Sequence, residues 1–281
     1  MQNKWFILFL IALIATVVVS APAISITVLF EEISNDLGLS LVQIGFIWGF
    51  SSLAGIFTSL LGGAIVDRLG PKRVLSWCII LMGLAGASRG LSTSFYTLVF
   101  TVFLTGLLIT VIIMGMYKTI GIWFPHQQLG LAAGVLSMGM ALGFLLGSLL
   151  SASFLSPRLG GWRNVMFFYG ACSLVFAIIW QLTPSAPGST SQHKAEVTTV
   201  PMLQAIRHVA SLKAVWLLAL ALLGYSGCIQ GTLGYLPLFL RQSGWTDLNA
   251  DSAISSFHFA SMIMVLPIAF LSDRLGTRQK L

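Results

Sequence analysis

The most highly charged stretch of this sequence is GGAIVDRLGPKRVL, from Gly62 to Leu75. Four charged residues fall within seven positions of a chain that is 8% charged and 57% hydrophobic: Asp67, Arg68, Lys72 and Arg73. An ordinary basic loop would explain the three cations, but not an acid directly at the end of an apolar run. A carboxylate in that place is stabilised beside the positive N-terminal end of a neighbouring helix. We therefore interpret the stretch as more than an ordinary basic loop, and not as a catalytic site.

The same tetrapeptide occurs again near the end of the chain. DRLG at 67–70 recurs at 273–276, an offset of 206 residues, and both copies close an apolar run. The residues that define the two copies are Gly63, Asp67, Arg68, Gly70, Lys72 and Arg73, and then Asp273, Arg274 and Gly276. A repeated element at this spacing predicts an internally duplicated chain.

Two further cations lie in or beside apolar segments, where charges are functional candidates by default. Lys118 lies within the fourth apolar segment, and Arg89 lies near the end of the third. Each could contact a solute, but each is close enough to a segment end for its side chain to extend to water instead. His258 could act as a proton switch or as a packing residue. The sequence leaves these alternatives open.

Features typical of metal or nucleotide sites do not occur in the sequence. There is no G-x-x-x-x-G-K-[S/T] phosphate loop, and no Asp or Glu falls in the middle of an apolar segment. The cysteines are far apart and lie inside apolar runs, which favours packing roles: Cys78, Cys172 and Cys228. We predict no enzyme activity, no cofactor and no metal site.

Long apolar segments must position all of these residues. Soluble domains average about 25% charged residues, so a chain this apolar, with a mean hydropathy of +0.93, predicts an all-α polytopic membrane protein. Each segment is long enough to cross a hydrocarbon layer of ~30 Å at about 1.5 Å per residue. The expected segments are 5–30, 41–66, 74–91, 96–123, 129–154, 165–182, 214–240 and 253–271.

The order of segments and polar stretches divides the chain into three parts. Residues 1–182 predict a six-helix N-terminal bundle, 183–212 a cytoplasmic linker rich in Pro, Ser and Thr, and 213–281 an incomplete C-terminal bundle with helices seven and eight. Most basic residues fall on the side of the N-terminus, as in cytoplasmic loops. The net charge of +7 therefore indicates cytoplasmic termini rather than nucleic-acid binding. The acids expected on the opposite side are Glu31, Glu32, Asp36, Asp247 and Asp251.

Together these features resemble the major facilitator superfamily of secondary transporters. The stretch G-x-x-x-D-R-L-G-P-K-R, at 63–73, resembles the family signature between helices two and three, and DRLGTRQK resembles its weaker copy between helices eight and nine. W-F-P at 123–125 and G-W-R at 161–163 are similar to the starts of helices five and six. Helix five resembles an antiporter-associated motif, except that Phe144 stands in place of its proline. The resemblance covers the whole chain.

The resemblance implies two six-helix bundles that rock about a central site. It implies that Asp67 binds helix eleven of the second bundle and favours an outward-open state. It also implies that Asp273 lies beside the start of helix five, near 127–131. Family members use helices four and seven to border a cavity, so the cavity candidates are Tyr117, Tyr225, Gln230 and Tyr235.

Helix five carries small residues at a spacing of four, which lets two helices approach closely. The residues are Gly139, Gly143 and Gly147. They predict close packing, either of a general kind or along a seam that faces the second bundle.

The function implied is secondary active transport of a small solute across a cell membrane. The expected partners are the lipid bilayer, the solute and a coupling ion, and Lys118 and Arg89 slightly favour an anionic solute. Family members have twelve helices, so eight segments predict a truncated chain or fragment without helices 9–12. The alternatives are an inert, non-transporting membrane protein and one part of a split carrier.

Overall fold

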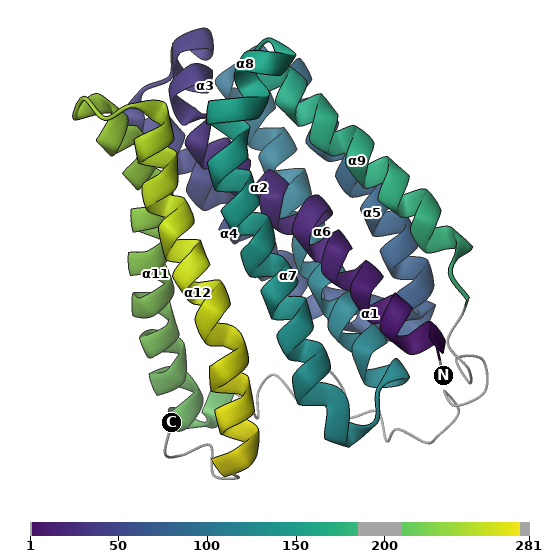
Figure 1. Cartoon of the computed structure of the whole chain (residues 1–281). Coiled ribbons are helices and arrows are strands. Elements are labelled where there is room, and N and C mark those ends of the chain that lie inside the picture. The colour runs from purple at the N-terminus through teal and green to yellow at the C-terminus, as the bar shows by residue number, and fades with distance from the viewer. Residues whose placement is uncertain (1, 185–209, 276–281) are drawn as a thin grey trace.

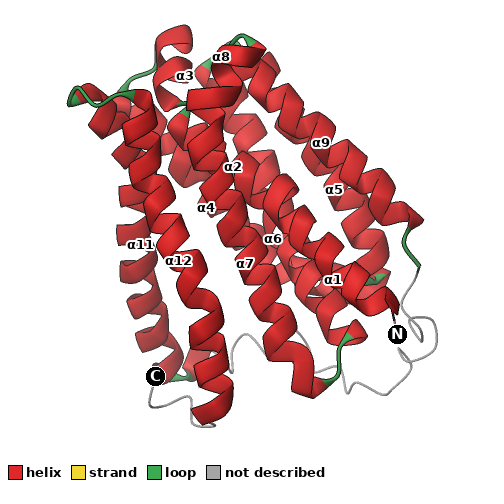
Figure 2. Ribbon diagram, in the orientation of Figure 1, coloured by secondary structure: helices red, strands yellow, loops and turns green. Residues whose placement is uncertain are grey.

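In a computed structural model of the chain, residues 2–184 and 210–275 are described, and every regular element in these ranges is a helix (Figure 2). This confirms the predicted all-α class. Most of the predicted linker and Gly276 lie outside the described residues. The helices run side by side, with α3 and α8 at one end and the N-terminus at the other (Figure 1). We call these the α8 end and the N-terminal end.

The first span is one continuous rod built from three pieces. They are α1 (Gln2–Ile14), a π-helical segment η1 (Ala15–Ser20) and α2 (Ala21–Val28). Pro22 is near the start of α2, and proline cannot donate the backbone hydrogen bond that an ordinary helix interior needs. The wider π turns just before it let the rod continue without a break. A short acidic helix, α3 (Phe30–Leu37), follows and ends at Gly38, whose φ is +63°.

The charged stretch forms the tight turn between α4 and α5. These helices are α4 (Leu41–Leu69) and α5 (Pro71–Ser88). Gly70 separates them with a φ of +79°, and Pro71 begins α5, a position where a missing N–H costs nothing. A 3-10 turn, η2 (Arg89–Leu91), ends α5.

The remaining helices complete the described part of the chain. They are α6 (Phe95–Trp123), η3 (His126–Gln128), α7 (Leu129–Leu150), η4 (Ser151–Leu155), α8 (Ser156–Leu159), α9 (Trp162–Leu182), α11 (Lys213–Gln242) and α12 (Asp247–Leu275).

Seven helical stretches of the described residues are long and apolar enough to cross a membrane. They correspond to the first seven predicted segments. The eighth segment forms α12, which is not among the seven and begins at Asp247 rather than at Ala253. The difference at its start matters, because it places Asp251 inside a helix and not in a loop.

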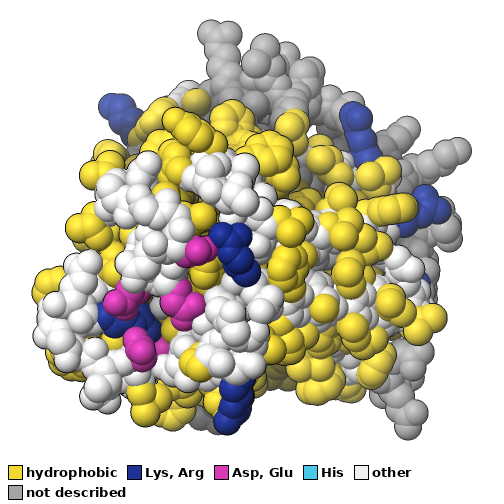
Figure 3. Space-filling view, turned by 90° about the horizontal axis from the view of Figure 1, so that it is seen from above, with side chains coloured by type: hydrophobic (Ala, Val, Ile, Leu, Met, Phe, Trp, Pro, Cys, Tyr) yellow, Lys and Arg dark blue, Asp and Glu magenta, His cyan; other side chains and the backbone are white. Residues whose placement is uncertain are grey.

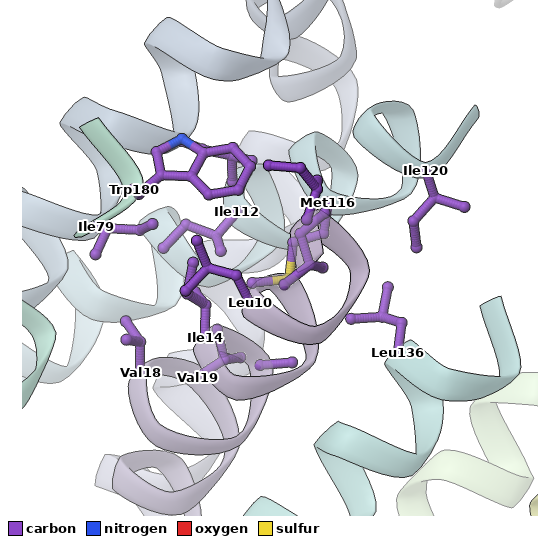
Figure 4. Close-up of a cluster of buried hydrophobic side chains, with 14 of the residues drawn as sticks. Leu10, Ile14, Val18, Val19, Ile79, Ile112, Met116, Ile120, Leu136 and Trp180 are labelled. Carbon is purple, nitrogen blue, oxygen red and sulfur yellow. The ribbon is translucent and has the colours of Figure 1, made fainter. Parts of the chain in front are cut away.

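We call residues 2–182, which contain six of the seven membrane-length stretches, the six-helix part, and the first span lies at its centre. Its apolar side chains pack with those of α5, α6, α7 and α9 (Figure 4). The cluster includes Leu10, Ile14, Val18, Ile79, Ile112, Met116, Leu136 and Trp180. Within a membrane such packing stabilises by van der Waals contact rather than by removal of water. By contrast, the most apolar window of α11 has no buried residue.

The glycines of α7 face the first span. A Cβ atom at Gly139, Gly143 or Gly147 would lie 2.5–2.7 Å from a backbone carbonyl oxygen of that span. Thr16 adds a hydrogen bond across the contact, from Oγ1 to the Gly139 carbonyl oxygen at 2.7 Å. The glycines therefore let two helices of the same part touch. The alternative of a glycine seam towards the second part is wrong, because α12 packs on a different side of α7, where Phe144 and Ser148 lie.

Candidate functional site

A cavity of about 580 Å³ lies between the six-helix part and the α11–α12 pair. Residues of α2, α4, α6, α7, α11 and α12 line it, together with Arg89. Four residues that the sequence offered as solute contacts or as a proton switch are among them: Arg89, Tyr225, Gln230 and His258. None of the residues that line it is an Asp or a Glu.

Arg89 brings a positive charge to this cavity. It is 4% exposed, and its Nη2 donates to the Thr105 hydroxyl of α6. Its Nε is buried and has no hydrogen-bond partner in the described part of the chain. A guanidinium stays protonated, and burying a charge is costly unless it is paired. Arg89, a residue that lines the cavity, therefore carries a buried charge with one unpaired donor.

His258 lies on the opposite, α12 side of the cavity. Its ring stacks on Phe144 of α7, with centroids 5.1 Å apart and an interplanar angle of 21°. Phe257 meets the same ring edge-on at 5.4 Å. The residue is 5% exposed, and within the described residues its Nε2 has no partner. Two aromatic contacts fix the ring and leave a polar atom free.

The wall formed by α11 is attached to α4. Trp48 Nε1 donates to the Gln230 carbonyl oxygen at 2.9 Å, and a Cβ at Gly234 would lie 2.6 Å from the Trp48 ring. Tyr235 donates its hydroxyl to the Leu41 carbonyl oxygen at 3.2 Å. Tyr235 thus joins α11 to the start of α4 and is not among the residues that line the cavity.

An ionic cluster joins α11 and α12 to the six-helix part at the α8 end. Arg241 is its centre, with a side chain only 4% exposed. Its nitrogens lie 2.7 Å from Asp247, 2.5 Å from Asp251 and 3.6 Å from Glu31 of α3. Asp251 is fully buried and also accepts a hydrogen bond from Ser153 of η4 at 2.6 Å. Figure 3 looks down on this end, where acidic side chains surround a basic one.

A second ion pair at the α8 end stays within the six-helix part. Arg163, at the start of α9, lies 2.6 Å from Asp36 of α3 and donates to the Ser92 carbonyl oxygen at 2.7 Å. Hydrogen bonds from Arg163, and then from Trp162, hold the pKa of the Asp36 carboxyl below its ordinary value. The G-W-R stretch thereby anchors α9 to α3 and to the loop before α6.

At the N-terminal end, the α4–α5 turn is bound to other helices of the six-helix part. Lys118 of α6 donates to the Asp67 carboxylate, and Lys72 donates to the Thr183 carbonyl oxygen. Trp180 Nε1 donates back to the Lys72 carbonyl oxygen at 3.2 Å. Arg68 and Arg73 are exposed.

Comparison with known protein families shows to which family the chain belongs. A profile of the Major Facilitator Superfamily matches residues 5–281. The chain belongs to the Major Facilitator Superfamily. A crystal structure of a bacterial homologue of the human lysosomal transporter Spinster, inward-facing and occupied, shares the fold with a TM-score of 0.71 at 22% identity. That match covers 89% of this chain and 57% of the other.

Curated superfamily relatives resemble the chain over part of their length. A "probable galactarate/D-glucarate transporter" of Escherichia coli is 27% identical over 53% of this chain and 34% of its own. A "probable nitrate/nitrite antiporter" of Thermus thermophilus is 25% identical, and the match covers 90% of this chain and 58% of the relative. A "probable anion transporter" of Arabidopsis thaliana chloroplasts is 32% identical, and the match covers 57% of this chain and 31% of the relative. The chain thus spans about a third to three fifths of the relatives that it matches.

The structure separates the predicted solute contacts of this superfamily member into two groups. Arg89, Tyr225 and Gln230 come together at the cavity. Lys118 does not, because its ammonium group is bound to Asp67, and neither do Tyr117, which is 43% exposed, and Tyr235.

The expected contacts of the signature residues are not tested by the described residues. Asp67 pairs there with Lys118 of the same part, and its contact with helix eleven stays a prediction. Asp273 and Arg274 lie in the last turn of α12, and their side chains, like Gly276, are outside the described residues. The expected contact between Asp273 and 127–131 is therefore not tested. A Cβ at Gly63 would meet no atom within 4 Å.

Sequence reasoning missed the cluster around Arg241. It placed Asp247 and Asp251 outside the eighth apolar segment, although acids four residues apart share a helix face. The sequence also contains a G-x-S-x-G pattern at 86–90. That pattern marks a nucleophile when it forms a turn between a strand and a helix. Here it ends helix α5, and the Ser88 hydroxyl donates to the Ala85 carbonyl oxygen at 2.8 Å. In the part of the chain that is described, no three His, Cys, Asp or Glu side chains could hold a metal ion.

Proposed function

We propose that this chain carries the solute pathway of a secondary transporter for a small anion. The observation that supports it best is the buried Arg89 guanidinium at the central cavity, with no acid among the residues that line it. A cation in such a place is complemented by an anionic solute. The names of several relatives, which refer to nitrate, sugar diacids and anions, agree with this class.

The proposed mechanism is alternating access in a cell membrane, with both termini in the cytoplasm and a gradient of an ion or a second solute as the driving force. The α8 end would then face away from the cytoplasm. The chain acts with four further helices, on the same or a separate polypeptide, and performs no chemical conversion of the solute.

The α4–α5 turn is proposed as the cytoplasmic gating element. Its charged side chains come from a tight turn between two spans, and the Asp67–Lys118 pair holds α4 against α6. Movement of α4 during gating requires this pair to rearrange. The glycines of α7 keep the first span fixed against α7 during such movement.

Binding to the purified chain in detergent tests the solute class. A ligand that binds only the folded protein raises its stability in proportion to the logarithm of its concentration over Kd. We expect saturable stabilisation by at least one of nitrate, D-glucarate and D-gluconate, but none by D-glucose. Stabilisation by D-glucose alone, or by none of the four, would overturn the proposal.

A further inference from the structure

The exposed residues of α5 form one narrow stripe along the helix. Within Pro71–Ser88 the exposed side chains are Arg73, Trp77, Leu81 and Leu84, and the others are half-buried or buried. Their spacing of four, four and three residues places all of them on a single helix face. We call these four residues the α5 stripe. From the N-terminal end inward, a cation is followed by an indole ring and then by two aliphatic side chains.

The cation at the start of the stripe is not neutralised within the described part of the chain. No described residue forms a hydrogen bond or ion pair with the Arg73 side chain, and the same holds for the exposed Arg68 across the turn. The one acid of this turn, Asp67, is bound to Lys118. Arg73 therefore offers an exposed guanidinium to a partner outside the described residues.

Contacts between α5 and α9 hold the stripe in place without covering it. The Lys72 ammonium group donates to the Thr183 carbonyl oxygen, and Trp180 Nε1 donates to the Lys72 carbonyl oxygen at 3.2 Å. Farther along, a Cβ at Gly83 would lie 3.0 Å from the Gly170 carbonyl oxygen, so the two helices touch where they run side by side (Figure 1). The stripe is thus a fixed surface of a packed helix pair.

The side chains of the stripe suit a lipid better than another helix. Helices that pack within a membrane approach each other through small residues, as the glycines of α7 do. The stripe has no small residue, and its Trp77 is 67% exposed. Tryptophan is typical of the membrane–water interface, where its ring lies at the level of the headgroups. The order cation, indole, aliphatic side chain matches the order of headgroup, interface and hydrocarbon.

We infer that the α5 stripe binds an anionic phospholipid. Arg73 binds the phosphate group, for which a guanidinium provides two parallel donors. The Trp77 ring lies beside the glycerol region, and the acyl chains pack on Leu81 and Leu84. Anionic lipids are characteristic of the cytoplasmic leaflet, which is the side proposed above for this end. The inference rests on the proposed function for that side alone, and it does not depend on the solute class.

Three probes separate the headgroup charge from the acyl chains. Dioctanoyl phosphatidylglycerol has a net negative charge and two chains, dioctanoyl phosphatidylcholine has the chains without net charge, and glycerol 3-phosphate has the charge alone. Native mass spectrometry of the purified 281-residue chain measures their binding. We expect phosphatidylglycerol to bind at least about fivefold more tightly than phosphatidylcholine, as for ~1 kcal/mol per basic residue. Glycerol 3-phosphate should bind most weakly.

Variants then place the site on the stripe. Arg73→Gln should weaken phosphatidylglycerol about fivefold and leave phosphatidylcholine within about twofold, while Arg73→Lys should keep the preference for the anionic lipid. Trp77→Ala should weaken both lipids alike, because the ring contributes whatever the headgroup charge. Arg158→Gln is the matched control and should change neither, since Arg158 is an exposed cation at the α8 end, over the Phe154 ring.

Several results would overturn the inference. These are equal binding of the two lipids, glycerol 3-phosphate binding as tightly as phosphatidylglycerol, and an equal loss in Arg158→Gln and Arg73→Gln. Should Arg73→Gln not fold, the unaltered chain is measured in 1 M salt, where screening should reduce the preference to within about twofold; an unchanged preference would refute the ionic contact. Failure of lipid binding leaves the anionic solute untouched, whereas stabilisation by D-glucose alone refutes the solute class and not the lipid site.

Discussion

The two ends of the molecule use their charges differently. At the α8 end, Arg241 and Asp251 bind Glu31 and Ser153, so the contacts cross from α11 and α12 to the six-helix part. At the N-terminal end, the ion pair and hydrogen bonds of Asp67 and Lys72 stay inside the six-helix part over the residues that the structure describes. The first arrangement holds two parts of the molecule together, and the second holds one part in shape.

The charged side chains at the α8 end are also more deeply buried than those at the N-terminal end. Asp251 is fully buried and the Arg241 side chain is 4% exposed, whereas the Asp67 side chain is 65% exposed. Removing one partner of a buried pair leaves the other charge desolvated, while an exposed pair exchanges its partner for water. The contacts between the two parts should therefore dominate stability at the α8 end, and single charge substitutions at the N-terminal end should matter little.

The largest effect is expected from Asp251→Ala. It leaves the buried Arg241 without its closest carboxylate and Ser153 without its acceptor. Loss of one partner from a buried pair costs about 3–5 kcal/mol, so we expect a destabilisation of about 3 kcal/mol in equilibrium unfolding of the purified chain. Asp247→Ala is the matched control, because Asp247 binds the same guanidinium from a side chain that is 72% exposed. Equal losses for both variants would show that burial is not what distinguishes the two acids.

An intermediate effect is expected within the six-helix part, where packing rather than charge holds the first span. A Cβ at Gly143 would lie 2.5 Å from the Thr16 carbonyl oxygen, so Gly143→Ala must push α7 away from η1. Overpacking of this kind costs about 1–3 kcal/mol. Thermal unfolding should show a lower Tm for Gly143→Ala than for Gly121→Ala, since a Cβ at Gly121 meets no atom within 4 Å and alanine is the better helix former. A Tm for Gly143→Ala at or above that of Gly121→Ala would contradict the close contact.

A smaller effect, dependent on pH, is expected from Asp36→Asn. The Arg163 side chain lowers the pKa of Asp36 in the folded protein. A lowered carboxyl pKa adds stability above the unfolded value of 3.8, and this contribution is lost as the pH falls through the folded pKa below it. The stability difference between the unaltered chain and Asp36→Asn should thus be constant from about pH 7 to about pH 5 and should close only below 3.8. Since both side chains are partly exposed, it should not exceed about 1 kcal/mol. A difference that closes already near neutral pH would exclude this pair as its source.

The sequence predicts features that depend on local patterns, and it does not predict contacts between distant helices. The spans follow from local apolar runs, and two of the residues that line the cavity, Tyr225 and Gln230, follow from the family resemblance. The Arg241 cluster could not be found in this way, because its members form one site only once α12 packs beside η4 and Arg241 of α11 reaches Glu31 of α3. Periodicity likewise identified the glycine face of α7 but not its neighbour, since a repeat marks a face and does not say what covers it.

The position of a cation along a span indicates its role less well than the partner that its side chain binds in the folded chain. Lys118 and Arg89 were equivalent in the sequence, as cations near segment ends. Among the described residues, Lys118 has a carboxylate on the neighbouring helix as its partner, whereas Arg89 has the Thr105 hydroxyl and no acid. Of these two cations, the one without an acid in the described part is the one at the cavity, and no local pattern distinguishes them.

The smallest effect is expected from Asp67→Asn at the N-terminal end. Its partner Lys118 has a side chain that is 24% exposed, and Asp67 itself is far more exposed. Water can solvate the ammonium group once the carboxylate is gone, so the loss should be at most about 0.5 kcal/mol. The pair Asp67→Asn and Lys118→Gln, measured singly and together by equilibrium unfolding, isolates the coupling between the two side chains. A coupling energy as large as the loss from Asp251→Ala would refute the contrast between the two ends, because an exposed pair inside one part would then stabilise the fold as much as the buried cluster that joins two parts.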